Sequence, residues 1–336
     1  MKLFWPITIL LILACMLLNL TLGSVEIPFD AVVSILLGDD TQNEIWSNII
    51  WKSRLPQTLT ALVAGAGLSV CGIMMQTVFG NPLAGPSVLG ISSGASLGVA
   101  FVVLLSGSIG GVALSSLGIA AEVSLTLGAI LGSLAIMGVI VYVSHRIQGQ
   151  ITLLIIGVMV GYVANAIIGV LKFFSIEEDI KAYVIWGLGS FSRVSGGQMV
   201  LFVTMMLVLL PLSCLFIKTL DLMLLGDSYA SNLGLNIRKA RTRIIIYTGV
   251  VTAVVTAYCG PIMFLGLAVP HICRGLLRTS SHRTLLPASL AFGALTALAC
   301  SLIARMPGFQ GALPVNSVTA LIGAPVVIWV LMRRKK

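Results

Sequence analysis

Long apolar stretches separated by short polar segments make up nearly the whole chain. A transmembrane helix needs about 20 predominantly apolar residues, and ten stretches approach that length. They cover residues 3–22, 56–78, 88–106, 123–143, 151–173, 198–217, 243–259, 262–277, 285–304 and 314–332. Only helices and closed barrels satisfy their backbone groups inside a bilayer. The pattern therefore predicts an all-α integral membrane protein of about ten transmembrane helices, forming one polytopic domain over residues 1–336.

The seventh and eighth stretches are short and follow each other directly. Gly260 and Pro261 separate them, and a proline cannot continue a regular helix because it has no backbone N–H. Irregular backbone at membrane depth is tolerated where neighbouring helices satisfy its polar groups. We therefore expect a broken pair of helices here, the second of part length.

Composition agrees with this class and narrows it. The 336 residues are 58% hydrophobic and only 9% charged, whereas about a quarter of the residues of a soluble domain are charged. The six cysteines are scattered singly, without the close spacing of metal ligands. We therefore expect these cysteines to be small packing residues, and no bound metal.

The distribution of charge predicts the orientation of the helices. An even number of spans places both termini on one side, and Lys and Arg are retained in cytoplasmic loops. Fourteen of the twenty basic residues fall on the side of the terminal RRKK sequence, and eight of the eleven acidic residues fall on the other. We expect both termini in the cytoplasm. The net charge of +9 then reflects orientation and contact with anionic lipid, and no nucleic-acid partner is expected.

Two segments on the predicted outer side mix apolar and charged residues. Residues 30–51 and 176–192 could each form a short amphipathic helix on the membrane surface. The second segment could also enter the membrane as a re-entrant helix. The sequence leaves both arrangements open.

The longest polar stretch on the predicted cytoplasmic side is the loop of residues 218–242. Asp227 can cap a short helix whose end Gly234 marks. Leu225, Tyr229 and Leu233 recur every four residues, so they share one face of that helix. A tether has no need of an apolar face, so we interpret the loop as a docking surface for another protein.

The chain lacks the groups that would let it power transport by itself. No span interior holds a clear Asp, Glu, Lys or Arg, which ion-coupled transporters usually carry. The GxxxxGK[ST] phosphate loop of many ATPases is absent as well. The energy source is therefore expected on another polypeptide. The alternative is an ion-coupled secondary transporter that needs no ATPase. An integral membrane enzyme would require a nucleophile with a base or paired metal ligands, so we expect no catalytic residues.

Seven segments in order resemble the permease subunits of ABC importers for iron-siderophores, haem and cobalamin. They are RLPQTLTALVAGAGLSVCGIMMQ, NPLAGPSVLGISSGASLG, WGLGS, GDSYASNLG, GPIMFLGLAVPHICR, HRTLLPASLAFGA and LPVNSVTALIGAP. The resemblance covers nearly the whole chain. It implies a homodimer in the bacterial inner membrane whose central path is lined by the fifth and tenth spans.

The resemblance also implies partners and cargo. The partners are two ATP-binding cassette ATPase subunits and a periplasmic or lipid-anchored substrate-binding protein. ATP would bind to the ATPase, and the permease would hold no cofactor of its own. The expected cargo is a metal chelate, with a ferric siderophore the first choice and haem or cobalamin the alternatives.

Site residues follow from the same resemblance. The coupling helix that contacts the ATPase would contain Gly226, Asp227, Tyr229, Ala230, Leu233 and Gly234, within a coupling loop of about residues 218–242. Arg54 and Arg305 would receive carboxylates of the binding protein. The cytoplasmic gate would include Asn81, Pro82, Leu83 and Gln150.

The chain departs from the family pattern at four positions. Gln57, Ser301, Ala312 and Asn316 stand where other residues are usual, which puts the detailed docking of the binding protein in doubt. His271 and Cys273 are two residues apart and so do not share a helix face; we therefore expect no metal site at this pair.

Overall fold

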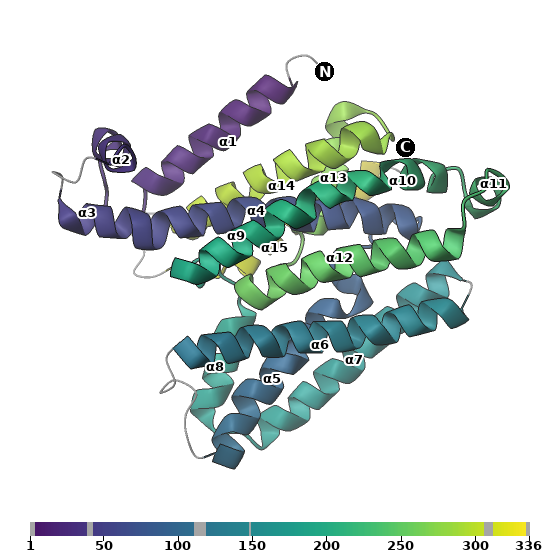
Figure 1. The fold of residues 1–336 in the computed structure, drawn as a ribbon, viewed down its shortest axis with the longest axis horizontal. Helices are drawn as coiled ribbons and strands as arrows, with labels where there is room; N and C mark the ends of the chain where they lie inside the picture. Colours follow the sequence, from purple (N-terminus) through teal and green to yellow (C-terminus); the bar gives the residue numbers. More distant parts are fainter. Residues whose placement is uncertain (1–3, 39–42, 111–118, 148, 306–311, 334–336) are drawn as a thin grey trace.

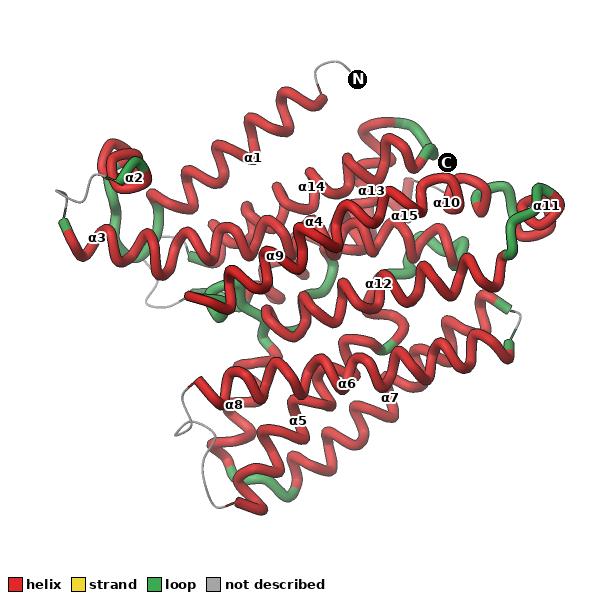
Figure 2. The backbone as a smooth tube through the Cα atoms, in the orientation of Figure 1, coloured by secondary structure: helices red, strands yellow, loops and turns green. Residues whose placement is uncertain are grey.

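The computed structural model describes residues 4–38, 43–110, 119–147, 149–305 and 312–333, and this part of the chain is helical without strands (Figures 1 and 2). Seven helical stretches in it are long and apolar enough to cross a membrane, and three shorter apolar helices accompany them. These ten match the ten predicted stretches one to one. Their helices are α1 (Phe4–Thr21), α4 (Leu55–Val78), α5 (Ile91–Gly110), α6 (Ile119–Arg146), α7 (Gln150–Phe173), α9 (Gly196–Leu212), α12 (Ile237–Cys259), α13 (Leu265–Leu277), α14 (His282–Ala304) and α15 (Val315–Arg333).

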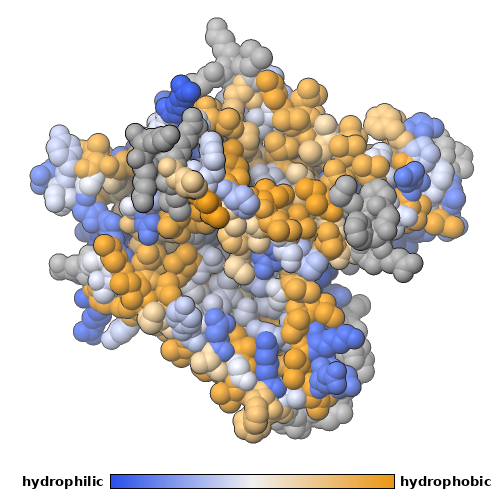
Figure 3. Space-filling view, turned by 180° about the vertical axis from the view of Figure 1, so that it is seen from behind, coloured by the Kyte–Doolittle hydropathy of each residue, from blue (hydrophilic) through white to orange (hydrophobic). Residues whose placement is uncertain are grey.

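Helices α4 and α12 form the centre of the fold. Their apolar stretches are 89% and 78% buried, whereas those of α1 and α9 are 17% and 22% buried. Side chains that face outward on the peripheral helices are apolar, and Figure 3 shows broad hydrophobic areas across one face of the molecule. A water-exposed protein would not leave so much apolar surface open. These outer faces suit contact with lipid or with another transmembrane subunit.

Glycines let the central helices pack backbone against backbone. A Cβ atom added to Gly72 of α4 would lie 1.7 Å from the carbonyl oxygen of Gly266 in α13. One added to Gly98 of α5 would lie 1.9 Å from the carbonyl oxygen of Gly128 in α6. Small residues at such crossings are typical of membrane helices, which gain from close van der Waals packing. At these two crossings, glycine therefore lets the helix backbones touch.

The predicted helix break is confirmed. Helix α12 ends at Cys259 and α13 begins at Leu265, with residues 260–264 outside any helix. The two amphipathic segments are also largely helical: α2 (Phe29–Leu36), α3 (Glu44–Ile49) and the π-helical η1 (Ile50–Arg54) lie in or beside the first, and α8 (Glu177–Gly187) lies in the second. Helix α8 packs against α5 and buries Asp179, Tyr183 and Trp186 along one face.

Residues 218–242 are more helical than a polar loop suggests. The 3-10 turn η4 (Ser213–Phe216) and α10 (Ile217–Met223) continue α9, and a separate short helix α11 (Asp227–Asn232) follows. Helix α12 then starts at Ile237 rather than at residue 243, because Arg241 is buried inside the fold instead of marking its edge. We call the end of the molecule that carries α10 and α11 the loop end (right in Figure 1). The opposite end, which carries α2, α3 and α8, is the far end.

Candidate functional site

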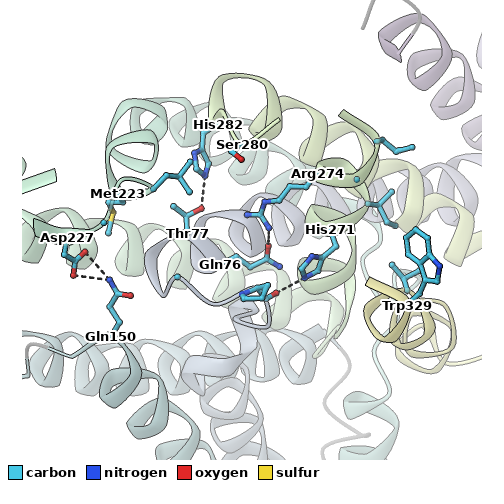
Figure 4. A pocket seen from close by; sticks show the side chains of 18 residues that line it. Gln76, Thr77, Gln150, Met223, Asp227, His271, Arg274, Ser280, His282 and Trp329 are labelled. Carbon is cyan, nitrogen blue, oxygen red and sulfur yellow. Dashed lines mark hydrogen bonds between the residues drawn. The ribbon is translucent and has the colours of Figure 1, made fainter. Parts of the chain in front are cut away.

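A cavity of about 890 Å³ opens at the loop end, where several predicted site residues meet (Figure 4). Its wall combines the last turn of α4, the turn that follows it, the start of α7, the segment between α10 and α11, the end of α13 and one side of α15. The lining residues are Gln76, Thr77, Gly80, Pro82, Gln150, Met223, Leu224, Gly226, Asp227, His271, Ile272, Arg274, Gly275, Leu276, Ser280, His282, Val326 and Trp329.

Helix α11 is a short helix bounded by two left-handed glycines. Gly226 precedes it with φ +91° and Gly234 follows it with φ +88°, a region that other residues rarely adopt. The prediction that Gly234 ends the helix is confirmed. The prediction that Asp227 caps it is wrong, since the capping position is Gly226 and Asp227 is the first helical residue. The Asp227 carboxylate is thereby free of the helix backbone and reaches neighbouring elements.

The two sides of α11 differ in burial. Ala230 is fully buried against the fold, whereas Tyr229 is 61% exposed and Leu233 is 55% exposed. Leu225, just before the helix, is exposed as well. These are the three residues that the four-residue spacing placed on one face. The protein therefore exposes three apolar side chains, Leu225, Tyr229 and Leu233, in and directly beside a short helix whose Ala230 is buried.

Asp227 connects α11 to the start of α7 and to α12. Gln150 Nε2 donates to both carboxylate oxygens of Asp227 at 3.1 Å. Arg241 donates from its terminal nitrogen to Asp227 Oδ2 at 2.9 Å. Only 7% of the Arg241 side chain is exposed, against 41% for Asp227. A predicted coupling residue and a predicted gate residue, 77 positions apart, are thus in direct contact.

Arg241 is the residue that sequence reasoning missed. The sequence shows it as one of several basic residues between 238 and 243, which looks like an exposed cationic run. Burying an arginine costs free energy unless a carboxylate pairs with it. The ion pair with Asp227 therefore allows Arg241 to be buried. Nothing in the spacing of the basic residues distinguishes it from its neighbours.

The predicted gate turn is closed by a side-chain hydrogen bond and contacts two helices. Asn81 Oδ1 accepts from the Leu83 backbone N–H at 2.9 Å, closing the turn. His271 Nε2 of α13 is 2.8 Å from the Pro82 carbonyl oxygen. A Cβ atom at Gly80 would lie 3.4 Å from Gln150 Oε1. The turn therefore lies between α13 and Gln150. Gln150 in turn donates to the Asp227 carboxylate.

A second polar connection joins α10 to α4 through α14. The Asp221 carboxylate is 2.8 Å from His282 Nδ1 and accepts from the His282 backbone N–H at 2.7 Å. His282 Nε2 lies 2.8 Å from Thr77 Oγ1, near the end of α4. Gln76 beside it accepts from Arg274 of α13 and donates to the Leu267 carbonyl oxygen. Hydrogen bonds thus connect α10, through His282 of α14, to the last turn of α4, which leads into the gate turn.

The two predicted docking arginines lie together at the far end and both contact the end of α1. Arg54 is 4% exposed and donates to the carbonyl oxygens of Leu20, Thr21 and Val25. Arg305 donates to Asn19 and to the Ser301 carbonyl oxygen. Burial, and then the neighbouring Arg54 charge, lower the pKa of Arg305 to about 10. Arg54 thus bonds two carbonyls in the last turn of α1 and one in the segment that follows it.

Replacing Arg54 with methionine should loosen the end of α1. The variant keeps the apolar stem but removes every hydrogen bond from the guanidinium to the three carbonyls, and bonds to charged groups are worth about 1.5–3 kcal/mol each. We expect a loss of at least about 2 kcal/mol, seen as a lower unfolding temperature in detergent. An unchanged unfolding temperature would show that Arg54 does not hold α1.

The four departures from the family pattern have different surroundings. Gln57 and Ser301 are buried, and Ala312 is exposed. Asn316 makes hydrogen bonds to two other elements.

The two residues of the predicted non-metal pair lie in different surroundings: His271 faces the cavity and Cys273 is buried.

The chain matches known proteins over nearly all its length. Residues 10–333 match the FecCD transport family. The vitamin B12 import system permease protein BtuC of Klebsiella pneumoniae is 37% identical over 286 residues, which are 85% of this chain and 83% of that protein. The hemin transport system permease protein HmuU of Yersinia pestis is 33% identical over 299 residues, 89% of this chain and 86% of that protein.

A solved structure agrees in fold. It is described as an inward-facing conformation of a metal-chelate type ABC transporter, and it superposes with a TM-score of 0.83 at 26% identity over 99% of both chains. The family resemblance predicted from the seven motifs is thereby confirmed. The chain belongs to the FecCD transport family.

Proposed function

We propose that the chain is the permease subunit of an ATP-driven importer of a metal chelate in the bacterial inner membrane. The observation that carries the proposal is the contact of Asp227 in α11 with Gln150 and Arg241. A docked ATPase that pushes or pulls α11 would act directly on the start of α7 and on the gate turn beside it. Family membership supports the same function, because BtuC is named as a permease protein of a vitamin B12 import system and HmuU as a permease protein of a hemin transport system.

The apolar surface of Leu225, Tyr229 and Leu233 is the proposed ATPase dock. All three side chains are exposed: Tyr229 lies in α11, and Leu225 and Leu233 lie just before and just after it. Ala230, on the other side of α11, is buried. A rigid short helix passes on displacement, whereas a flexible tether absorbs it. ATP binding then biases the permease only as far as the ATPase prefers one of its conformations. The loop end is cytoplasmic in this proposal, and so are both termini.

The other proposed components follow from the family. Two copies of the permease would form the path, two ATPase subunits would bind at the loop end, and a substrate-binding protein would approach the far end. Arg54 and Arg305 remain candidates for docking it, because two neighbouring cations attract carboxylates and no described carboxylate lies within 4.0 Å of either. Both arginines are hydrogen-bonded to the end of α1. A docking protein would therefore contact the end of α1 as well as the two arginines.

The cargo class that we propose is a metal chelate. The names of the similar proteins refer to vitamin B12 import and to hemin transport. Cobalamin, haem and the predicted ferric siderophore are therefore the three candidate cargoes. Uptake of radiolabelled cobalamin, haem and a set of ferric siderophores by cells that contain the whole importer would separate the three. The cargo is the class that is taken up and whose unlabelled form, unlike those of the other two classes, reduces this uptake.

Loss of the dock should separate the permease from its ATPase without disturbing the fold. Replacing Tyr229 and Leu233 with alanine removes apolar surface that is exposed here, so we expect the unfolding temperature of the isolated permease to change little. The amount of ATPase that co-purifies should fall at least tenfold, since aromatic anchors dominate such contacts. Val184→Ala on the exposed side of α8 is the matched control. Co-purification at the wild-type level would exclude α11 as the dock.

A further inference from the structure

The broken segment between α12 and α13 holds an unusual backbone conformation. Phe264 has φ +68°, and Arg278 is the only other non-glycine residue in the described part of the chain with positive φ. A bulky aromatic residue in this region is strained. Strain of this kind persists only where surrounding contacts over-determine it, and it is often found at switch regions. The contacts around Phe264 must therefore hold it in this conformation.

Helix α15 supplies those contacts at two points. Asn316 Oδ1 accepts from the Met263 backbone N–H at 3.1 Å, one residue before Phe264. Two turns further along, Gly323 lies so close that a Cβ atom on it would be 2.5 Å from Phe264 Cβ. The Asn316 carbonyl accepts from Thr319 Oγ1 at 3.0 Å, which fixes the first turn of α15. The segment is thus held against α15 by one side-chain bond and one close packing contact.

The same residue also ties in the end of α8. The Asn316 backbone N–H donates to the Leu188 carbonyl oxygen at 3.3 Å. Beside it, Ser190 N–H donates to the Cys259 carbonyl oxygen at 2.8 Å, and Gly260 packs on the backbone of Trp186. Three elements, the end of α8, the break and the start of α15, therefore meet at Asn316.

Helices α13 and α15 lead from this junction to the cavity. Arg274 near the end of α13 and Trp329 in α15 line the cavity at the loop end. Thirteen residues separate Asn316 from Trp329, about 20 Å along a helix. Each helix contains one proline between junction and cavity, Pro270 in α13 and Pro325 in α15, and proline allows a helix to bend. A bend at these prolines would let the two ends of the helix pair move separately.

We propose that Asn316 is a positioning residue for transport: its bond to Met263 holds the far ends of α13 and α15 together while the cavity at the loop end is open. The inference rests on the proposed function, since it assigns the bond to one state of an alternating-access cycle. When the far end opens to receive cargo, the bond breaks and the strain at Phe264 is released. Asn316 touches no cargo in this scheme and acts only through the segment that it holds.

Native cysteines provide the test. Cys259 is fully buried at the junction, and Cys71 is fully buried in the middle of α4. The whole importer in lipid nanodiscs is treated with a membrane-impermeant maleimide, and labelling of each cysteine is measured by peptide mass spectrometry. For Asn316→Ala we expect Cys259 to label at least tenfold faster than in the wild type, with Cys71 unchanged and with ATP-driven uptake reduced at least fivefold. Asn316→Asp keeps an acceptor oxygen and should restore slow labelling.

Two further variants make the outcome decisive. Ser317→Ala, on the exposed side of the same turn, should label like the wild type. Gly323→Ala pushes on Phe264 from α15 and should expose Cys259 by a route independent of Asn316, which keeps the test valid if Asn316→Ala does not fold. Wild-type labelling of Cys259 in Asn316→Ala would overturn the proposal. Equal acceleration at Cys71 and Cys259 would overturn it as well, because Asn316 would then only stabilise the fold.

The wild type distinguishes failure of this inference from failure of the proposed function. If the wild-type importer does not couple uptake to ATP, the proposed function fails whatever the cysteines do. If it does couple them and the Asn316 variants behave as the wild type, only the role of Asn316 is wrong.

Discussion

Replacing Asp227 with alanine is expected to abolish ATP-driven uptake. The variant removes both hydrogen bonds from Gln150 and the ion pair with Arg241, so α11 loses its polar contact with α7 and α12. Removal of one partner of a fully buried pair costs about 3–5 kcal/mol. Because Asp227 is 41% exposed, we expect a smaller loss of about 2 kcal/mol. Uptake into proteoliposomes and the unfolding temperature measure the two effects.

Gln150→Leu separates transmission from stability. This variant leaves the Asp227–Arg241 ion pair in place, so the unfolding temperature should stay near that of the wild type and the ATPase should still co-purify. Uptake should nevertheless fall at least tenfold if the contact between α11 and α7 passes on the movement. Wild-type uptake in both variants would contradict the assignment of this network to energy coupling.

Replacing Gly72 with alanine is expected to cause the largest loss of stability by a single methyl group. The added Cβ would lie 1.7 Å from the Gly266 carbonyl oxygen and 2.7 Å from the Gly266 Cα. Both are backbone atoms, which cannot turn aside as a side chain can. Overpacking of a core typically costs about 1–3 kcal/mol, and we expect the upper end of that range. Helices α4 and α13 also carry Gln76 and Arg274, so the cavity would be distorted too.

Gly138→Ala is the matched control for this prediction. Gly138 lies within α6, and a Cβ atom on it would meet nothing within 4 Å. Alanine is favoured over glycine in a helix by up to about 1 kcal/mol, so this variant should unfold at the wild-type temperature or slightly above it. Equal unfolding temperatures for the two variants would show that α4 and α13 are not in backbone contact.

The hydrophobic pattern was sufficient to predict the membrane helices. All ten stretches are helices, and the break after Cys259 lies where Gly260 and Pro261 interrupt the pattern. Lipid imposes one simple rule, a long apolar helix, and a sequence displays that rule directly. The start of α12 was predicted at residue 243 instead of Ile237, because the rule places every arginine outside the membrane helix. Arg241 is instead buried within the helix, next to a carboxylate.

The site was predicted in parts but not as a whole. The spacing of Leu225, Tyr229 and Leu233 indicated an exposed apolar face, and the three residues are exposed. The contact between Gln150 and Asp227 joins positions 77 residues apart, and no local pattern contains it. Likewise, the inward direction of Arg54 depends on how α1 ends beside η1, which is a matter of tertiary packing. Asn316 stood out only as a departure from the family, with no indication of its bond to Met263.

The central claim is that energy for transport enters through α11 from a separate ATPase. The most direct test is uptake of the identified chelate into proteoliposomes that contain the permease and the binding protein, with and without the ATPase. We predict uptake only when the ATPase and ATP are both present, and none with Tyr229→Ala/Leu233→Ala permease. Uptake that proceeds without any ATPase, driven by a proton or sodium gradient, would contradict the claim and favour an ion-coupled secondary transporter.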